Sequence, residues 1–391
     1  MTKSLRQVDA KNAARKAATI LEPSYSHWVR QAILSNHDAV SLFDSSVEEP
    51  KALVMGALSR LQSGRQSDRY TSAFVNGNPF AVQALSRRYQ IPESHFLTTS
   101  AATNALALVY ETFLKPGDQV IIETPGFDLL AMGAARFGGQ IDTVRRSGGE
   151  IDLGELAAKV TNKTRLIVLS DLHNPSGFGL SEASLRFVSQ VAERHGAHVV
   201  VDEVYGDYAR GSRFSSAALL GKNIIAINSL TKIFGLSTLR FGWIVAHPDV
   251  LRPVRDLAER QDFTISNLSH AVAAVVLEDD ETFDGYRHNI MSEARPIMAA
   301  EFSKWCAEGL LDGALPPHGC ICFPRVVGIR NTAAFSDWLA ETHKVCVAPG
   351  EYFGAPGFVR IGFGKRSGSL QKALARFGEG LRSYAASFAG R

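Results

Sequence analysis

Short apolar runs recur through the middle of the chain and predict its central strands. They lie within residues 119–123, 166–169, 197–201 and 224–227, and polar or small residues follow each run. Runs without regular polar alternation favour parallel strands that are buried on both faces. An amphipathic stretch at 181–195 lies between the second and third runs and predicts a strand–helix–strand unit with a right-handed crossover. Both strands of this unit would end at one edge of the sheet.

The N-terminal part of the chain predicts a mixture of helices and short strands. A basic helix is expected to end at Pro23, because proline cannot continue it. A short strand and turn follow at 40–46, and a helix is expected at 81–89. Residues 95–100 predict a strand that leads directly into a helix at 101–113.

The C-terminal part predicts a second, smaller unit. Charged amphipathic helices follow residue 249, and the later one, at 286–308, is expected to connect the two units. Short strands are expected at 317–323, 345–350 and 358–362. No linker or internal repeat separates the parts, so the second unit must be assembled from both ends of the chain.

The alternation of strands and helices predicts an α/β fold with two domains. A large domain over residues 45–280 would hold a mostly parallel sheet flanked by helices. A smaller α/β domain would combine residues 1–44 with residues 281–391.

Composition narrows the class of protein. The chain has 391 residues, 45% of them hydrophobic and 21% charged, with a formal net charge of +3. These values are typical of a globular enzyme, so we expect no nucleic-acid partner. The first 20 residues lack an apolar signal core, and no run of 18 apolar residues occurs, so we expect a cytoplasmic protein without a membrane partner. The four cysteines lack zinc-finger spacing, so we expect reduced thiols and no metal site.

The most informative polar residue is Lys232, which follows the apolar run at 224–227. Open α/β sheets bind ligands at the carboxyl ends of their strands. Ser229 and Arg240 flank the lysine and could close on a phosphate from two sides. A lysine beside a phosphate site indicates a Schiff-base cofactor, although an isolated loop lysine is more often a solvated side chain.

Two more strand ends carry polar residues with suitable chemistry. Asn174 and Asp202 follow the runs at 166–169 and 197–201, so they are expected beside Lys232 at one edge of the sheet. Each has an ordinary alternative, because Asn-Pro-Ser-Gly is a turn signature and an aspartate can cap a helix. The conjunction of the three favours a shared site.

The start of the helix at 101–113 is a candidate phosphate site. Free backbone N–H groups and the positive end of the helix dipole bind phosphate at such a position. Ala101 and Ala102 are small enough for close approach, and Thr103 adds a hydroxyl. The alternative is an ordinary helix capped by Ser100.

The ordered motifs resemble those of the class I/II aminotransferases, the fold-type I enzymes that use pyridoxal 5'-phosphate (PLP). They include N-P-S-G, D-E-V-Y, S-L-T-K and R-F-G-W, and the resemblance extends from about residue 40 to residue 363. It implies that Lys232 holds PLP as a Schiff base and that Asp202 keeps the pyridine nitrogen protonated. It also implies that Asn174 and Tyr205 bond the ring oxygen and that Phe127 stacks on the ring.

The resemblance also assigns substrate and interface residues. Arg360 would bind the substrate α-carboxylate, Ser45 would lie near the substrate, and Tyr70 would reach the cofactor phosphate of the other subunit in a homodimer. The chain departs from the family pattern at Ala101, where glycine is frequent, and at Cys320, which replaces a glycine. The spacing from Tyr70 to Gly77 is also longer than is common.

The reaction that the resemblance implies is transfer of an amino group from an amino acid to a 2-oxo acid. A PLP-dependent β-elimination or amino acid oxidation on the same fold is the alternative, and no residue separates these reactions. A PLP-binding regulator is a different class of protein, but it would need a winged helix-turn-helix, for which the roughly 40 residues before the core leave no room. The lysine argues against an inert scaffold.

Overall fold

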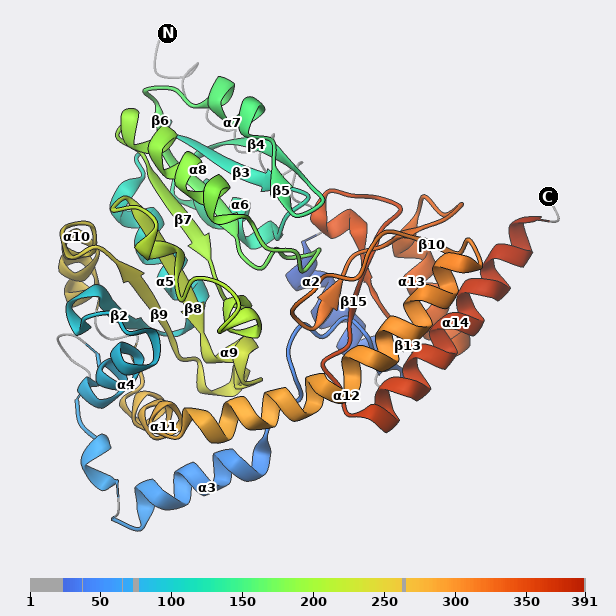
Figure 1. The fold of residues 1–391 in the computed structure, drawn as a ribbon, viewed down its shortest axis with the longest axis horizontal. Helices are drawn as coiled ribbons and strands as arrows, with labels where there is room; N and C mark the ends of the chain where they lie inside the picture. The colour runs from blue at the N-terminus through green and yellow to red at the C-terminus, as the bar shows by residue number, and fades with distance from the viewer. Residues whose placement is uncertain (1–23, 37, 65, 73–76, 262–264, 390–391) are drawn as a thin grey trace, which may run out of the picture.

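The computed structural model describes residues 24–389, apart from residues 37, 65, 73–76 and 262–264. The basic helix expected before Pro23 lies outside the described residues. Figure 1 shows two parts side by side. One is a large sheet flanked by helices, and the other is a smaller group of strands and helices.

An eight-stranded sheet forms the large part, in the spatial order β2-β9-β8-β7-β6-β3-β4-β5. Neighbours from β8 through β4 run parallel, whereas β9 runs antiparallel to both β2 and β8. The mostly parallel sheet predicted from the apolar runs is therefore confirmed. The strands are β2 (Phe96–Thr99), β3 (Gln119–Thr124), β4 (Gln140–Ser147), β5 (Glu150–Ile151), β6 (Thr164–Ser170), β7 (His198–Asp202), β8 (Ile224–Ser229) and β9 (Gly242–Ala246).

The central strands are apolar throughout because helices cover both faces of the sheet. Val168 of β6 belongs to the core formed with α5, α6 and α10, whereas its neighbour Ile167 packs in the core formed with α7 and α8. Successive strand residues point to opposite faces, so both faces need apolar side chains. The helices of the large part are α3 (Lys51–Gln62), α4 (Pro79–Tyr89), α5 (Ala101–Phe113), α6 (Asp128–Arg136), α7 (Leu153–Lys159), α8 (Glu182–Arg194), α9 (Leu230–Ile233), α10 (Pro248–Arg260) and α11 (Asn267–Glu278).

A long helix, α12 (Asp280–Ala307), connects the large part to the smaller one (Figure 1). The interpretation that this helix begins at residue 286 is wrong. It begins at Asp280, directly after α11, because acidic residues fill its first turn and favour the positive end of its dipole.

The smaller part contains three short sheets: β11-β15-β14, β10-β12 and β1-β13. Its predicted strands are present but shorter than expected. For example, β11 covers two residues of the range 317–323, since the preceding prolines and glycine form a turn. The elements are α2 (Tyr25–Ser35), β1 (Val40–Ser41), β10 (Leu311–Asp312), β11 (Ile321–Cys322), β12 (Arg325–Val326), α13 (Thr332–His343), β13 (Val345–Cys346), β14 (Ala348–Pro349), β15 (Val359–Gly362) and α14 (Ser367–Ala389).

Both ends of the chain contribute to the smaller part. Val40 of β1 pairs in parallel with Val345 of β13, although the two are far apart in sequence. Across the described residues, none of the helices is both long and apolar enough to cross a membrane.

Candidate active site

Lys232 lies in the short helix α9, one turn beyond the end of β8. Its Nζ donates a hydrogen bond to Ser45 Oγ at 2.8 Å. The Tyr208 hydroxyl donates to the Lys232 carbonyl oxygen at 3.0 Å. The lysine is thus held both at its backbone and at its side-chain tip.

A cavity of about 200 Å³ lies at the carboxyl edge of the sheet, next to Lys232. Every site residue singled out in the sequence lines it, with the exception of Tyr70. These lining residues are Ser45, Ala101, Ala102, Thr103, Phe127, Asn174, Asp202, Tyr205, Ser229, Lys232, Arg240 and Arg360. The structure therefore brings together residues from strand ends, a helix start and a distant loop.

Burial shifts the pKa values of the titratable groups in the cavity. It lowers the pKa of Lys232 to about 8, and the positive charge of Arg360 acts in the same direction. It raises the pKa of Asp202 to about 6, against the opposing effects of the Val204 N–H and Lys232. Such shifts tune an amine and a carboxylate for proton transfer near neutral pH.

The Tyr205 hydroxyl is an unsatisfied donor at the cavity. It is buried and has no hydrogen-bond partner among the residues that the structure describes. Burial also raises the pKa of Tyr205, so its proton stays in place. A buried polar group without a partner costs about 1–3 kcal/mol, and an oxygen of a bound ligand would remove that cost. This donor fits the ring oxygen of PLP.

The start of α5 lines the cavity at the place where the sequence predicts a phosphate cradle. The Ser100 side chain does not cap the helix, so the first N–H groups are not capped by that hydroxyl. Ala101 adopts a positive φ of 67°, and a side-chain carbon added at Gly242 would lie 2.7 Å from Ala101 Cα. The alternative of an ordinary Ser100-capped helix is therefore wrong. The same close approach explains why β9 begins with a glycine, since any side chain at position 242 would collide with the Ala101 backbone.

Arg360 also lines the cavity and is fully buried. Its Nη1 donates to Asn174 Oδ1 at 2.8 Å, and its Nη2 donates to Phe43 O at 2.9 Å. Its Nε has no partner among the described residues. A buried guanidinium with an unused donor is well suited to binding a carboxylate.

Tyr25 is a site residue that the sequence analysis missed. It lines the cavity, its hydroxyl accepts a hydrogen bond from Arg360 Nη2, and its ring centre lies 4.8 Å from Arg360 Cζ. The backbone N–H of Tyr25 donates to Asp128 Oδ2 at 2.7 Å. No local motif marks this tyrosine, because its partners lie far away in the sequence.

A buried ion pair supports the loop that carries Asn174. Arg146 Nη1 lies 2.6 Å from Glu123 Oε2, and Glu123 accepts hydrogen bonds from both the backbone N–H and the hydroxyl of Ser170. The Ser170 hydroxyl accepts in turn from the Asn174 N–H at 3.2 Å. His173, the chain neighbour of Asn174, does not line the cavity.

Tyr70 lies outside this cavity, and 61% of its surface is exposed. No group of three or more potential metal ligands occurs among the residues that the structure describes. The four cysteines are not joined in disulfides, and three of them are buried.

The mostly parallel sheet with a cavity at its carboxyl edge has the fold of solved PLP-dependent aminotransferases of fold-type I. The model of the family "Aminotransferase class I and II" matches residues 44–377. The chain therefore belongs to the class I and II aminotransferase family and is a PLP-dependent enzyme.

The similarities to particular proteins are moderate in sequence and high in fold. The chain is 28% identical over 342 residues to histidinol-phosphate aminotransferase of Moorella thermoacetica, which covers 86% of this chain and 84% of the relative. A PLP-dependent aminotransferase from Streptococcus suis 89-1591 has a TM-score of 0.83 at 22% identity, covering 93% and 98% of the two chains. The PLP-dependent cyclase OrfR has a TM-score of 0.81 at 25% identity, covering 93% and 97%. Because these relatives bear different names, the fold alone does not fix the reaction.

Proposed function

We propose that the chain transfers the amino group of an amino acid to a 2-oxo acid, with PLP attached to Lys232. The observation that carries this proposal is the composition of the cavity. The amine of Lys232, whose pKa is lowered, the buried carboxylate of Asp202 and the buried guanidinium of Arg360 line one cavity of about 200 Å³. PLP supplies an aldehyde that binds amines and a ring that withdraws electrons from the reacting carbon.

The residues at the sheet edge hold the cofactor in this proposal. The N–H groups of Ala101, Ala102 and Thr103 bind its phosphate, as expected of a helix N-terminus. Ser229 and Arg240 line the same cavity and would supply further donors to the phosphate.

The ring is held by a different set of residues. Phe127 would pack on the ring face, and Asp202 would keep the ring nitrogen protonated. Tyr205 donates to the ring oxygen with its otherwise unsatisfied hydroxyl. The Asn174 Oδ1 already accepts from Arg360, which leaves its Nδ2 to donate to the same ring oxygen.

Lys232 moves the proton in this mechanism. After the incoming amino acid has displaced Lys232 from the cofactor, the freed Nζ amine would accept the proton of the substrate Cα. Burial lowers the pKa of this amine to about 8, so part of it is neutral near pH 7. Arg360 fixes the substrate through its α-carboxylate, which keeps Cα next to that amine. Ser45 orients Nζ through the hydrogen bond between them.

We infer a cytoplasmic homodimer with two shared sites, in which Tyr70 reaches the phosphate of the partner subunit. Tyr70, Met55 of α3 and Leu268 of α11 are all exposed, and α3 packs against α11. Exposed apolar groups gathered on neighbouring elements support a partner surface there. The division into domains at residues 45–280 and at 1–44 with 281–391 remains part of this proposal.

A substrate screen tests the reaction. Twenty amino acids are incubated with pyruvate or 2-oxoglutarate, and the new amino acid, ammonia and hydrogen peroxide are measured, with Lys232→Ala as the inactive control. Turnover that depends on the 2-oxo acid is expected. Ammonia or peroxide formed without an acceptor would instead establish the elimination or oxidation alternative, and equal turnover by Lys232→Ala would contradict the role of the lysine.

A further inference from the structure

A buried polar cluster lies beside the active-site cavity, on the other side of the same strand ends. A small pocket there is lined by Glu203 and Asn228, which are the chain neighbours of Asp202 and Ser229 in the active-site cavity. Successive side chains of an extended chain point to opposite faces. The two pockets therefore lie on opposite sides of the strand ends. A shift of the residues between them would change the geometry of both pockets.

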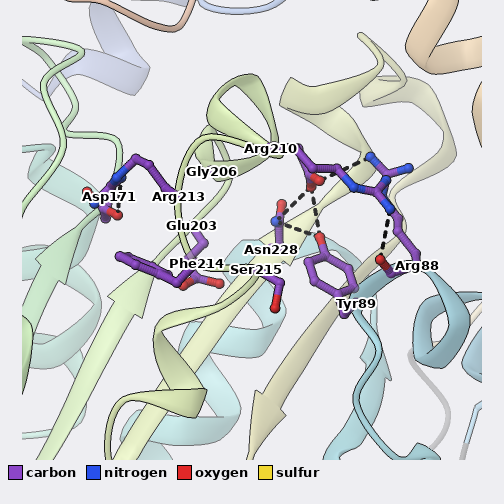
Figure 2. Close-up of a pocket in the computed structure, with 11 residues that line it drawn as sticks. Arg88, Tyr89, Asp171, Glu203, Gly206, Arg210, Arg213, Phe214, Ser215 and Asn228 are labelled. Atoms are coloured by element: carbon purple, nitrogen blue, oxygen red, sulfur yellow. Dashed lines mark hydrogen bonds and ion pairs between the residues drawn. The ribbon is translucent and has the colours of Figure 1, made fainter. Parts of the chain in front are cut away.

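Asp207 is the acceptor that the cluster shares. Its Oδ1 accepts from Arg88 Nη2 at 3.0 Å, and its Oδ2 accepts from the Tyr89 hydroxyl at 2.8 Å and from Asn228 Nδ2 at 3.5 Å. Figure 2 shows Tyr89 and Asn228 pointing toward one another, with Arg88 beside them. Burial by itself would raise the pKa of Asp207, but the adjacent Arg88 and Arg287 outweigh it and lower that pKa. Asp207 is therefore an ionised acceptor.

Asn228 connects this cluster to the active site. Its Nδ2 donates to the Tyr89 oxygen at 3.2 Å, and its Oδ1 accepts from the Ser229 N–H at 2.7 Å. Ser229 is the last residue of β8, and α9 with Lys232 begins directly after it. The side chain of Asn228 therefore holds the backbone of Ser229 at the end of β8.

The cluster is anchored from a distant element as well. Arg88 Nη1 lies 2.6 Å from Asp280 and 2.8 Å from Asp284, both in the first turns of α12. Arg88, Tyr89, Asp207 and Asn228 are each more than nine-tenths buried. Charge-assisted bonds in such a buried cluster reinforce one another, so its geometry is strongly held.

We propose that Asn228, held by Asp207 and Tyr89, is a positioning residue for the cofactor phosphate and acts through Ser229. This inference rests on the proposed function, in which Ser229 binds the phosphate. It predicts a defect that depends on the phosphate, since the ring contacts of Asp202, Tyr205 and Phe127 do not involve Asn228.

The test compares two ligands on the PLP-free protein. Dissociation constants for PLP and for pyridoxal, which lacks the phosphate, are measured by absorbance titration for wild type and Asn228→Ala. PLP should bind about ten-fold more weakly to the variant, as expected from a lost buried hydrogen bond, while pyridoxal affinity changes less than about three-fold.

Asn223→Ala is the matched control. Asn223 is also buried, lies just before the other end of β8, and donates to the backbone carbonyls of Ser189 and Ala197 at 3.0 and 3.1 Å. Its loss should lower the melting temperature and leave both dissociation constants unchanged. Tyr89→Phe, which removes only the hydroxyl, should weaken PLP selectively but less than Asn228→Ala.

The outcomes separate this inference from the proposed function. An unchanged PLP affinity, or equal weakening of PLP and pyridoxal, would overturn the positioning role of Asn228. If Asn228→Ala does not fold, Tyr89→Phe takes its place in the test. Weaker binding of PLP without weaker binding of pyridoxal would then support the positioning role, and equal changes in the two would overturn it. Wild type that fails to bind PLP at all would overturn the proposed function instead.

Discussion

Lys232 should reduce the stability of the PLP-free protein, because its ammonium group is largely removed from water. The folded-state pKa of about 8 lies below the ordinary value of 10.5. Below pH 8 the lysine is charged in both the folded and unfolded states, and the folded state bears the full cost. As the pH rises from 8 to 10.5 the folded protein releases the proton first, so the free energy of unfolding increases.

Lys232→Met should therefore stabilise the PLP-free protein at pH 7. We expect a gain of about 1–2 kcal/mol, less than the full pKa shift implies because the side chain faces an open cavity. Urea denaturation at pH 7 and pH 9.5 measures it, and the gain should shrink at the higher pH. Lys222→Met, at an exposed position, is the control. A gain of equal size at both pH values would show that packing, and not charge, is responsible.

Tyr25→Phe should weaken the binding of carboxylate-bearing substrates. The change removes the hydroxyl that accepts from Arg360 and keeps the ring between Phe127 and Phe353. We expect KM for amino acids to rise about five- to ten-fold, as one hydrogen bond to a charged group is lost, with little change for amines that lack a carboxylate. Tyr352→Phe, next to Trp28 and outside the cavity, should leave both unchanged. Equal effects on amines and amino acids would remove Tyr25 from carboxylate binding.

Among the elements, the junction of β2 and α5 carries backbone strain. Ala101 has a φ of 67°, in the left-handed region that costs a non-glycine residue roughly 1–2 kcal/mol. The backbone of Ala101 is nevertheless held in this conformation, since Gly242 of β9 packs directly against it.

Ala101→Gly should consequently be neutral or stabilising, by up to about 1 kcal/mol, because the relief of strain offsets the added freedom of the unfolded chain. Ala102→Gly, one residue further into α5, should instead destabilise by about 0.5–1 kcal/mol. Thermal unfolding of the two PLP-free variants shows which of them is the more stable. If Ala101→Gly proves the more damaging change, the cradle does not hold the strained conformation in solution.

At the scale of the whole molecule, the proposed dimer predicts complementation between two defective chains. Lys232→Ala should be inactive, and Tyr70→Phe should be impaired, because its hydroxyl would bond the phosphate of the partner subunit. In the heterodimer one site combines both changes, and the other has an intact lysine with an intact tyrosine. Co-expression with two affinity tags, followed by activity assays on the purified heterodimer, should recover activity toward one wild-type site per dimer.

Two results would contradict this arrangement. A monomer in sedimentation analysis would remove the shared site altogether. Purified heterodimers without recovered activity would show that Tyr70 acts within its own subunit or has no role, which its long spacing to Gly77 would explain.

Much of the fold was predictable because burial on both faces leaves a direct trace in the sequence. The apolar runs that became β3, β6, β7 and β8 are uniform for that reason, and each is followed by the polar residues that its strand end displays. Lys232, Asn174 and Asp202 were found in this way, since parallel strands that end together bring their next residues together. The start of α12 and the short strands of the smaller part were less predictable, because turns and caps decide such boundaries.

The remaining contacts depend on residues that only the tertiary structure brings together. Tyr25 and Arg360 are separated by 335 residues, and Arg88 and Asp284 by 196, so no local pattern marks either pair. The sequence determined which strands are buried and which polar residues stand at their ends, because periodicity and composition are local properties. Folding decided which of those ends share a cavity, which side chains lose water and shift in pKa, and which distant partners hold them, because burial and electrostatic coupling depend on distances in space.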